Sequence, residues 1–264
     1  LFGADFSKSK ARGGPYLFKA DGYIPTDAIR GDLAESWKWL EPPLRLEIQL
    51  RKGVMFPAKA GVMVARELVA QDVAYSFNRL MASPKRTAEY LDHIQRVEAP
   101  ERHKVVFYFN HFHEDWANRF GFGTYSSIYP KEVVDAGIGD WRKANGSGPF
   151  QIAEYIGGNS QNYVKNPLYW GKERIGGEEY KLPFLDRVSI RIMKDESARY
   201  AALRTGRLDV LQSITWSAAE ELKKNAPHLK WARWLQHGSP YIAMRTDTKP
   251  FNDVRVRRAM NMAV

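Results

Sequence analysis

The spacing of apolar residues changes from one secondary-structure period to another early in the chain. From Leu44 to Leu50 every second residue is Leu or Ile, the residues between them are polar, and Lys52-Gly53 follows. This alternation predicts a half-buried strand. From Ala70 to Ala82 apolar residues recur at helical spacing until Ser83-Pro84, which predicts an amphipathic helix. Because the chain must bury the apolar faces of both kinds of element, the sequence predicts an α/β or α+β fold (mixed α+β) with a mixed sheet.

Similar patterns predict further elements along the sequence. Residues 1–30 are rich in Gly, Pro and charge and predict loops with short strands. We expect further strands at residues 92–97, 104–109, 150–155, 161–165, 187–193, 208–211 and 241–244. The first two of these form a hairpin whose turn is residues 99–102, and residues 114–120 predict a short helix. A boundary is expected near residues 143–148, with hairpins before it and strand–helix–strand units after it.

Three further helices are predicted from their capping residues. Asp195 is a good N-cap for a helix that ends at Gly206. Ser217 and Glu220 have the spacing of a capping box and open the next helix. Asp253 is a good N-cap for a last helix that runs toward residue 264. Because that last segment simply stops and the chain opens without Met, we expect a processed or truncated piece.

The composition excludes several classes of protein. The chain has 264 residues, of which 44% are hydrophobic, and this is typical of folded domains rather than disordered chains. There is no cysteine, which excludes disulfides, thiol catalysis and Cys-based zinc sites. The net charge of +10 favours anionic partners, but the basic residues are spread along the chain without a block of like charge. No apolar run is long enough for a transmembrane helix.

Three kinds of short motif are candidates for chemistry, and each has a structural alternative. On a strand, His111 and His113 would point the same way and could meet one metal ion; the alternative is a polar loop at a strand end. The glycines of residues 121–123 and 146–148 lack the spacing of phosphate-binding loops, and we expect turns there. Residues 124–127 combine an aromatic ring with hydroxyls, as sites for small polar ligands do, and packing is the alternative.

Motifs for catalysis and for nucleic-acid binding have little support in the sequence. No Gly-x-Ser-x-Gly elbow is present, and no spacing singles out a catalytic pair of carboxylates. Trp231-Ala-Arg-Trp234 combines aromatic and basic residues, as proteins that bind single-stranded nucleic acid do. On a strand the two tryptophans would point to opposite faces, so we favour an ordinary edge strand.

A series of short motifs then identifies a family. In order they are Gly31-Asp-Leu-Ala-Glu-Ser-Trp37, Leu50-Arg-Lys-Gly-Val-Met-Phe56, Ala70-Gln-Asp-Val-Ala-Tyr-Ser-Phe-Asn-Arg79, Gly146-Ser-Gly-Pro-Phe150, Asn166-Pro-Leu-Tyr-Trp-Gly171, Pro183-Phe-Leu-Asp-Arg-Val188, Ala201-Ala-Leu-Arg-Thr-Gly-Arg-Leu-Asp-Val210 and Phe251-Asn-Asp-Val-Arg-Val-Arg-Arg-Ala-Met260. Together they resemble the extracellular solute-binding proteins of family 5, the dipeptide-, oligopeptide- and nickel-binding components of ABC importers. The resemblance begins near Gly31, and residues 1–30 are less similar.

The resemblance implies a type II periplasmic-binding-protein-like fold, in which two lobes close over a ligand. Members are about twice as long, so we expect the first lobe plus an extra subdomain, with the second lobe missing. Residues 1–143 would form the extra subdomain with part of the first lobe. Residues 144–250 would form the first ligand-binding lobe, and residues 251–264 would start the crossover into the missing second lobe.

The function that the resemblance implies is capture of a solute without chemistry. The expected ligand is a small peptide or peptide-like solute, delivered to a membrane ABC permease in the periplasmic or extracytoplasmic space of a bacterium. We expect no catalysis, no cofactor, no metal and no nucleic-acid partner, and a monomer when full length. The alternatives are an opine, an oligosaccharide or a metal chelate as ligand. A protein that binds an anionic polymer or nucleic acid is less favoured. A hydrolase has no feature in the sequence that supports it.

The resemblance also implies three groups of residues that contact ligand. They are the loop before Pro130-Lys-Glu132, the strand end that faces the cleft, and an arginine at the cleft edge: Thr124, Tyr125, Ser126, Gln212, Ser213, Trp216 and Arg245. Members commonly have an uncharged residue where Arg245 stands, so a bidentate contact to an anionic ligand group is expected, and a solvated arginine is the alternative.

Two departures from the family pattern accompany this site. The acidic residue that pairs with a peptide α-amine in peptide-binding members belongs to the absent lobe, so a complete site is not expected in this chain. Members often have Thr where this chain has Val69-Ala70, which predicts a weaker helix cap at that point.

Overall fold

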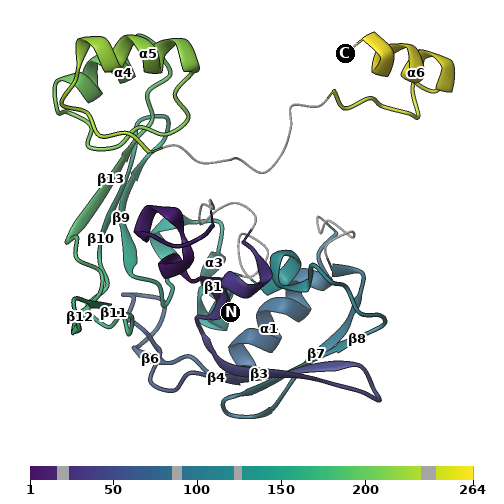
Figure 1. The fold of residues 1–264 in the computed structure, drawn as a ribbon. Coiled ribbons are helices and arrows are strands. Elements are labelled where there is room, and N and C mark those ends of the chain that lie inside the picture. Colours follow the sequence, from purple (N-terminus) through teal and green to yellow (C-terminus); the bar gives the residue numbers. More distant parts are fainter. Residues whose placement is uncertain (17–23, 85–90, 122–126, 233–241, 264) are drawn as a thin grey trace.

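The computed structural model describes residues 1–16, 24–84, 91–121, 127–232 and 242–263. Its body is a four-stranded antiparallel sheet in the order β3-β4-β8-β7. The strands are β3 (Ala34–Leu40), β4 (Arg45–Leu50), β7 (Ile94–Glu101) and β8 (Lys104–Phe109). Helix α1 (Ala70–Met81) packs on one face of this sheet against β7 and β8 (Figure 1).

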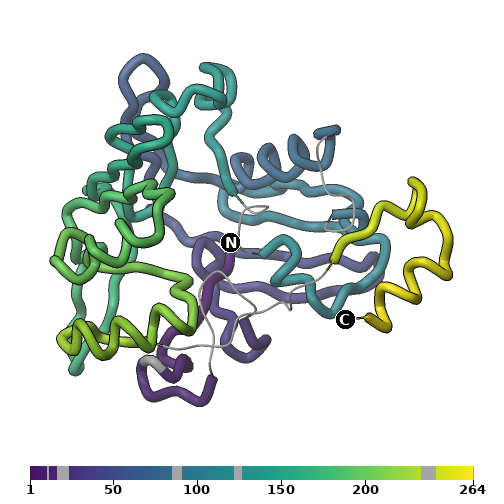
Figure 2. The backbone as a smooth tube through the Cα atoms, turned by 90° about the horizontal axis from the view of Figure 1, so that it is seen from above, coloured from purple at the N-terminus to yellow at the C-terminus, as the bar shows by residue number. Residues whose placement is uncertain are grey.

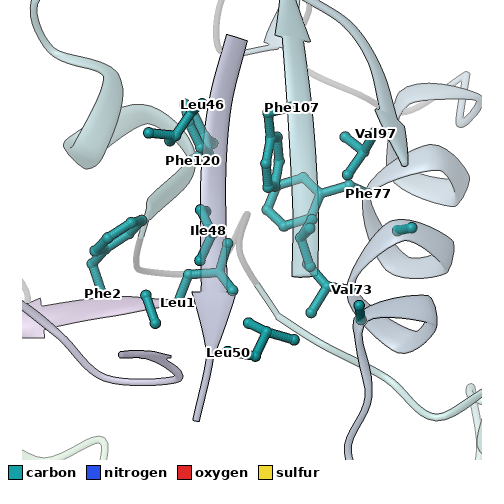
Figure 3. Close-up of a cluster of buried hydrophobic side chains, with 14 of the residues drawn as sticks. Leu1, Phe2, Leu46, Ile48, Leu50, Val73, Phe77, Val97, Phe107 and Phe120 are labelled. Carbon is teal, nitrogen blue, oxygen red and sulfur yellow. The ribbon is translucent and has the colours of Figure 1, made fainter. Parts of the chain in front are cut away.

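The predicted alternation of β4 and the predicted helix of α1 are both confirmed. Leu46, Ile48 and Leu50 are fully buried, while the intervening residues face outward. On α1, Val73 and Phe77 face the sheet and are buried. Figure 3 shows these side chains meeting those of β7 and β8 in a single cluster. The two sequence periods therefore bury one apolar layer between sheet and helix.

Short elements add further residues to this apolar core. Strand β1 (Phe2–Ala4) pairs with β2 (Ile29–Gly31), and Leu1 and Phe2 join the main cluster. In the described part of residues 1–143, the other small elements are the 3-10 turns Phe6–Lys8, Lys10–Arg12, Thr26–Ala28 and Trp141–Lys143, the pair β5 (Met55–Phe56) and β6 (Arg66–Glu67), the π-helical turn η4 (Ala117–Gly121), and α3 (Lys131–Gly137). The expected short helix at 114–120 is thus a π-helical turn.

Residues from 150 onward form a three-stranded antiparallel sheet in the order β13-β10-β9. Its strands are β9 (Phe150–Ile156), β10 (Ser160–Lys165) and β13 (Arg187–Arg191), and the hairpin of β11 (Lys172–Ile175) and β12 (Glu178–Lys181) branches from it. Helices α4 (Glu196–Arg204) and α5 (Trp216–Asn225) follow at the far end of this sheet (Figure 1). We call residues 150–225 the extension. Figure 2 shows it in green beside the body, away from α1.

Several expected features differ in the structure. Residues 208–211 and 242–244 have no strand pairing, because an apolar run becomes a strand only beside a hydrogen-bonding neighbour. Helix α5 starts at Trp216 with Thr215 as N-cap, so Ser217 lies inside the helix. The β7–β8 turn is Arg102-His103, since the strands run on through residues 99–101. In the described residues the named strand pairs are antiparallel, so the mixed sheet and the strand–helix–strand units are not found there.

Other expectations on the later elements are confirmed. The Asp195 side chain accepts a hydrogen bond from the Ala198 N–H at 2.6 Å, which caps α4. Gly206 follows α4 with a φ of 70°, the left-handed conformation that favours glycine. Helix α6 (Val254–Ala263) begins after Asp253, whose carboxylate accepts the Arg255 N–H at 2.8 Å. Among the described residues, no helix is long and apolar enough to cross a membrane.

Candidate functional site

The loop with Thr124, Tyr125 and Ser126 lies outside the described residues, but both of its flanks are fixed to the body. Before it, Phe120 and Gly121 are buried, and a Cβ added at Gly121 would lie 2.9 Å from the Phe2 ring. After it, the Tyr129 N–H donates to the Ser76 hydroxyl of α1 at 2.9 Å. The ends of the predicted ligand loop therefore start from rigid elements.

A part-buried ion-pair network anchors the segment that follows the loop. Glu132, in the Pro130-Lys-Glu132 motif, accepts from Arg66 Nε at 2.6 Å and from Arg66 Nη2 at 2.8 Å. The same guanidinium donates to both carboxylate oxygens of Asp72, at 2.9 and 2.7 Å. We call Arg66, Asp72 and Glu132 the Arg66 clamp. It joins β6, the first turn of α1 and the first turn of α3.

The clamp also explains the departure at Val69. Asp72 Oδ2 accepts the Val69 N–H at 2.9 Å, which is the half of a capping box that the third helical residue supplies. Valine has no oxygen to supply the other half. Hydrogen bonds from the guanidinium lower the pKa of Glu132 to about 2, and the two carboxylates raise the pKa of Arg66. Glu132 and Arg66 therefore both stay charged at neutral pH.

The second predicted group is together at the start of α5. Gln212 and Ser213 are exposed in the segment before the helix, and Ser213 has a φ of 59°, a conformation that non-glycine residues rarely adopt and that is often found at functional positions. Trp216 opens the helix with 67% of its surface exposed. These three positions thus form one accessible, polar and aromatic corner of the extension.

An aromatic and cationic cluster at this corner was not anticipated. The Lys223 ammonium lies 5.3 Å from the ring centroid of Trp216 and 5.7 Å from that of Trp231. Trp216 and Lys223 are seven positions apart on α5, a spacing that puts both on one helix face. That spacing is a signal that sequence reasoning could have used. Trp231 therefore contacts a cation of its own chain.

Arg245 lies in a separate segment, beyond residues 233–241. Its guanidinium donates to both oxygens of Asp247, from Nε at 3.1 Å and from Nη2 at 2.6 Å. Both side chains are exposed. The fork of the guanidinium is thus arranged for a carboxylate. In the structure, Gln212, Ser213 and Trp216 lie together at the start of α5, and Arg245 belongs to a separate described segment.

The histidine motif does not form a metal centre in the described residues. Among them, no group of three or more His, Cys, Asp or Glu side chains is arranged to hold a metal ion. His113 Nδ1 accepts the Asp115 N–H at 3.2 Å, so this nitrogen has a structural role at the strand end. The polar-loop alternative fits this geometry.

Comparisons with known proteins agree with the motifs. The family described as bacterial extracellular solute-binding proteins, family 5 middle, matches residues 28–264. Di/tripeptide-binding protein 2 of Pseudomonas aeruginosa is 30% identical over 251 residues, which are 87% of this chain and 45% of that protein. The chain therefore spans about half the length of such curated relatives.

Solved structures show the same fold. The periplasmic binding protein DppA of Helicobacter pylori, in complex with the peptide STSA, is 26% identical with a TM-score of 0.63, over 84% of this chain and 46% of that one. MoaA of A. tumefaciens R10, in complex with mannopinic acid, is 24% identical with a TM-score of 0.68, over 98% and 48%. The fold is that of the type II periplasmic binding proteins. The chain belongs to family 5 of the bacterial extracellular solute-binding proteins.

Proposed function

We propose that this chain is part of the substrate-binding component of an ABC importer, which captures a small peptide or peptide-like solute and delivers it to a membrane permease. The observation that carries the proposal is the likeness, in sequence and fold together, to a binding protein that holds a peptide. The relatives' names support a periplasmic or extracytoplasmic location in a bacterium. The complete protein would act as a monomer and without catalysis.

The mechanism is non-covalent capture on prepositioned groups. The Arg66 clamp and the Ser76–Tyr129 contacts fix the segment that follows the loop with Thr124, Tyr125 and Ser126. A group attached to a fixed segment loses less conformational entropy on binding. Gln212 and Ser213 supply hydrogen-bonding groups, and Trp216 supplies an apolar wall. Such a mixture of polar groups and aromatic surface is typical of small-ligand sites.

Arg245 would bind an anionic group of the ligand. Its ion pair with Asp247 is solvent-exposed, and exposed pairs contribute little free energy. A ligand carboxylate can therefore replace Asp247 on the guanidinium at low cost. In a dipeptide or tripeptide, the matching group is the C-terminal carboxylate.

The substitution Arg245→Gln tests this role in the complete natural protein. We expect it to weaken binding of a dipeptide by about tenfold, the loss of one charge-assisted hydrogen bond, as measured by isothermal titration. Binding of the same dipeptide with an amidated C-terminus should be unchanged by the substitution. Arg255→Gln is the matched control, because Arg255 makes the same kind of forked pair with Asp253. Equal losses for both variants, or for both ligands, would remove Arg245 from the site.

The likeness to a protein that binds mannopinic acid favours a second candidate, an opine in the same transport role. A thermal-shift series with dipeptides, an opine, an oligosaccharide and a nickel–histidine chelate separates the two. Stabilisation by peptides supports the first proposal. Stabilisation by the opine alone would replace it. A duplex DNA arm at two salt concentrations tests the anionic-polymer alternative, which requires steep salt dependence.

A further inference from the structure

A buried histidine lies at the edge of the main core without a hydrogen bond. His93, just before β7, is fully buried, and within the described residues neither of its ring nitrogens has a hydrogen-bond partner. The imidazole stacks on Phe109 of β8, with ring centroids 5.6 Å apart and planes at 18°, and it also lies 5.9 Å from the ring of Phe120 in η4. Buried polar groups are normally paired, so this ring is an exception that invites a functional explanation.

The surroundings of His93 oppose a positive charge. The rings of His111 and His113, which follow β8, have centroids 6.2 and 5.8 Å from it, and Arg119 of η4 repels its charged form. Among the described residues, the carboxylate that favours the charged form is that of Asp92, whose Oδ1 is 3.7 Å from His93 Nδ1 and whose side chain is exposed. The pKa of His93 is lowered to about 4, chiefly by burial and also by Arg119 and His113, while Asp92 opposes the shift.

The ring is covered by a segment that lies outside the sheet. Strands β7 and β8 are paired, with register shifts between Ile94 and Arg96 and between Glu98 and Glu101, and β8 is paired on both sides. The covering segment, residues 116–121, contains the π-helical turn η4, and π-helical turns are rare and frequently found at functional sites. A proton on His93 needs water around it, and water can reach the ring most easily if Phe120 moves away.

We propose that His93 is a proton-operated latch: the neutral imidazole holds residues 116–121 on the sheet, and protonation releases them. The loop with Thr124, Tyr125 and Ser126 follows this segment directly in the chain. If the proposed function holds, on which this last step rests, acidification therefore also weakens ligand binding.

Hydrogen exchange measured by mass spectrometry tests the latch. Exchange of residues 115–121 is compared with that of α1 at pH 7.5 and 4.5, after correction for the intrinsic pH dependence. We expect protection of residues 115–121 to fall by about tenfold or more, since the open state binds the proton more tightly. His93→Phe, which keeps an aromatic ring in the stack, should abolish the fall. His228→Gln, at an exposed histidine after α5, should retain it.

Two further measurements keep the latch falsifiable if His93→Phe folds poorly. In the unaltered protein, the NMR titration of the His93 ring should have its midpoint well below 6.5, the ordinary pKa of histidine. The variant His113→Gln removes a repelling neighbour and should shrink the pH effect at residues 116–121. Unchanged protection at pH 4.5 in the unaltered protein overturns the latch, as does a fall that persists in His93→Phe.

Ligand titration at the same two pH values tests the coupling to binding. A weaker dipeptide affinity at pH 4.5 that His93→Phe removes supports it, and an affinity independent of pH overturns it. If no peptide binds at either pH, the proposed function fails, while the exchange data still decide the latch.

Discussion

Residues 1–143 and residues 144–263 both carry many large apolar side chains, but they bury them very differently. In the first region Phe56, Phe77, Phe107 and Phe120 are all almost completely buried in one cluster. In the described part of the second region, the buried apolar residues are Ala202, Leu203, Leu222 and Ala226. Phe184, Ile190, Val210 and Trp216 are all exposed there.

The difference shows that two kinds of force hold the two regions. The first region gains most of its stability from apolar surface removed from water. The second region is held by antiparallel ladders and by the Asp195 cap. Its alternating strand β13 leaves Ile190 exposed, although the sequence pattern is the same as that of β4.

The largest effect should come from matched deletions of one phenylalanine in each region. Phe107→Ala is expected to lower the free energy of unfolding by about 3–5 kcal/mol, because it leaves a cavity in a closed core. Phe184→Ala should change it by less than about 1 kcal/mol, since Phe184 is already 57% exposed. Chemical denaturation followed by circular dichroism measures both. Similar losses for the two variants would break the comparison.

A smaller effect is expected from the ion pairs of the two regions. Glu132→Gln removes one partner of the part-buried Arg66 clamp and should cost about 1 kcal/mol, a value that allows for solvent screening. Glu179→Gln removes the partner of Lys172 in an exposed pair and should have no measurable effect. The same denaturation experiment decides, and a larger loss at Glu179 would contradict the distinction.

The pH dependence of stability follows from the same clamp. The pKa of Glu132 is lowered to about 2, and so is that of Glu67, which accepts hydrogen bonds from Gly53 and Arg102. Between this value and their ordinary pKa near 4.5, the unfolded chain binds more protons than the folded chain. The free energy of unfolding should therefore fall as the pH falls from 4.5 to 2, and Glu132→Gln should reduce that fall. A fall of the same size in the variant would exclude Glu132 as a cause.

The smallest effect is expected at the helix caps, and it should be a gain. Val69→Thr supplies the missing oxygen at the N-cap of α1, whose extended backbone already suits a cap, and should stabilise the protein by about 0.5–1 kcal/mol. Thr215→Val at the start of α5 should be nearly neutral, because the Thr215 side chain makes no capping hydrogen bond. Thermal unfolding of the two variants checks this pair, and a loss at Val69→Thr would contradict the cap geometry.

Local pattern predicted the elements whose residues are close in sequence. The alternation of β4, the helical spacing of α1 and the cap at Asp195 are all found in the structure. The family motifs identified the fold because they keep their order along the chain. The strands expected at 208–211 and 241–244 are not found in the described residues, which exclude Tyr241, since a strand depends on a neighbour that the local sequence does not contain.

The sequence by itself determined the family, the periods of the main elements and the residue types available for ligand contact. Only the tertiary structure decided that Arg66 meets Glu132, which is 66 positions away. It alone placed His93 against Phe109 and Phe120, with no hydrogen-bond partner among the described residues. It also decided that the apolar residues of β4 are buried while Ile190 of β13 is exposed. The physical reason is that burial and pairing depend on what the fold places on the other side of a residue, and apolar spacing reports only which residues share a face.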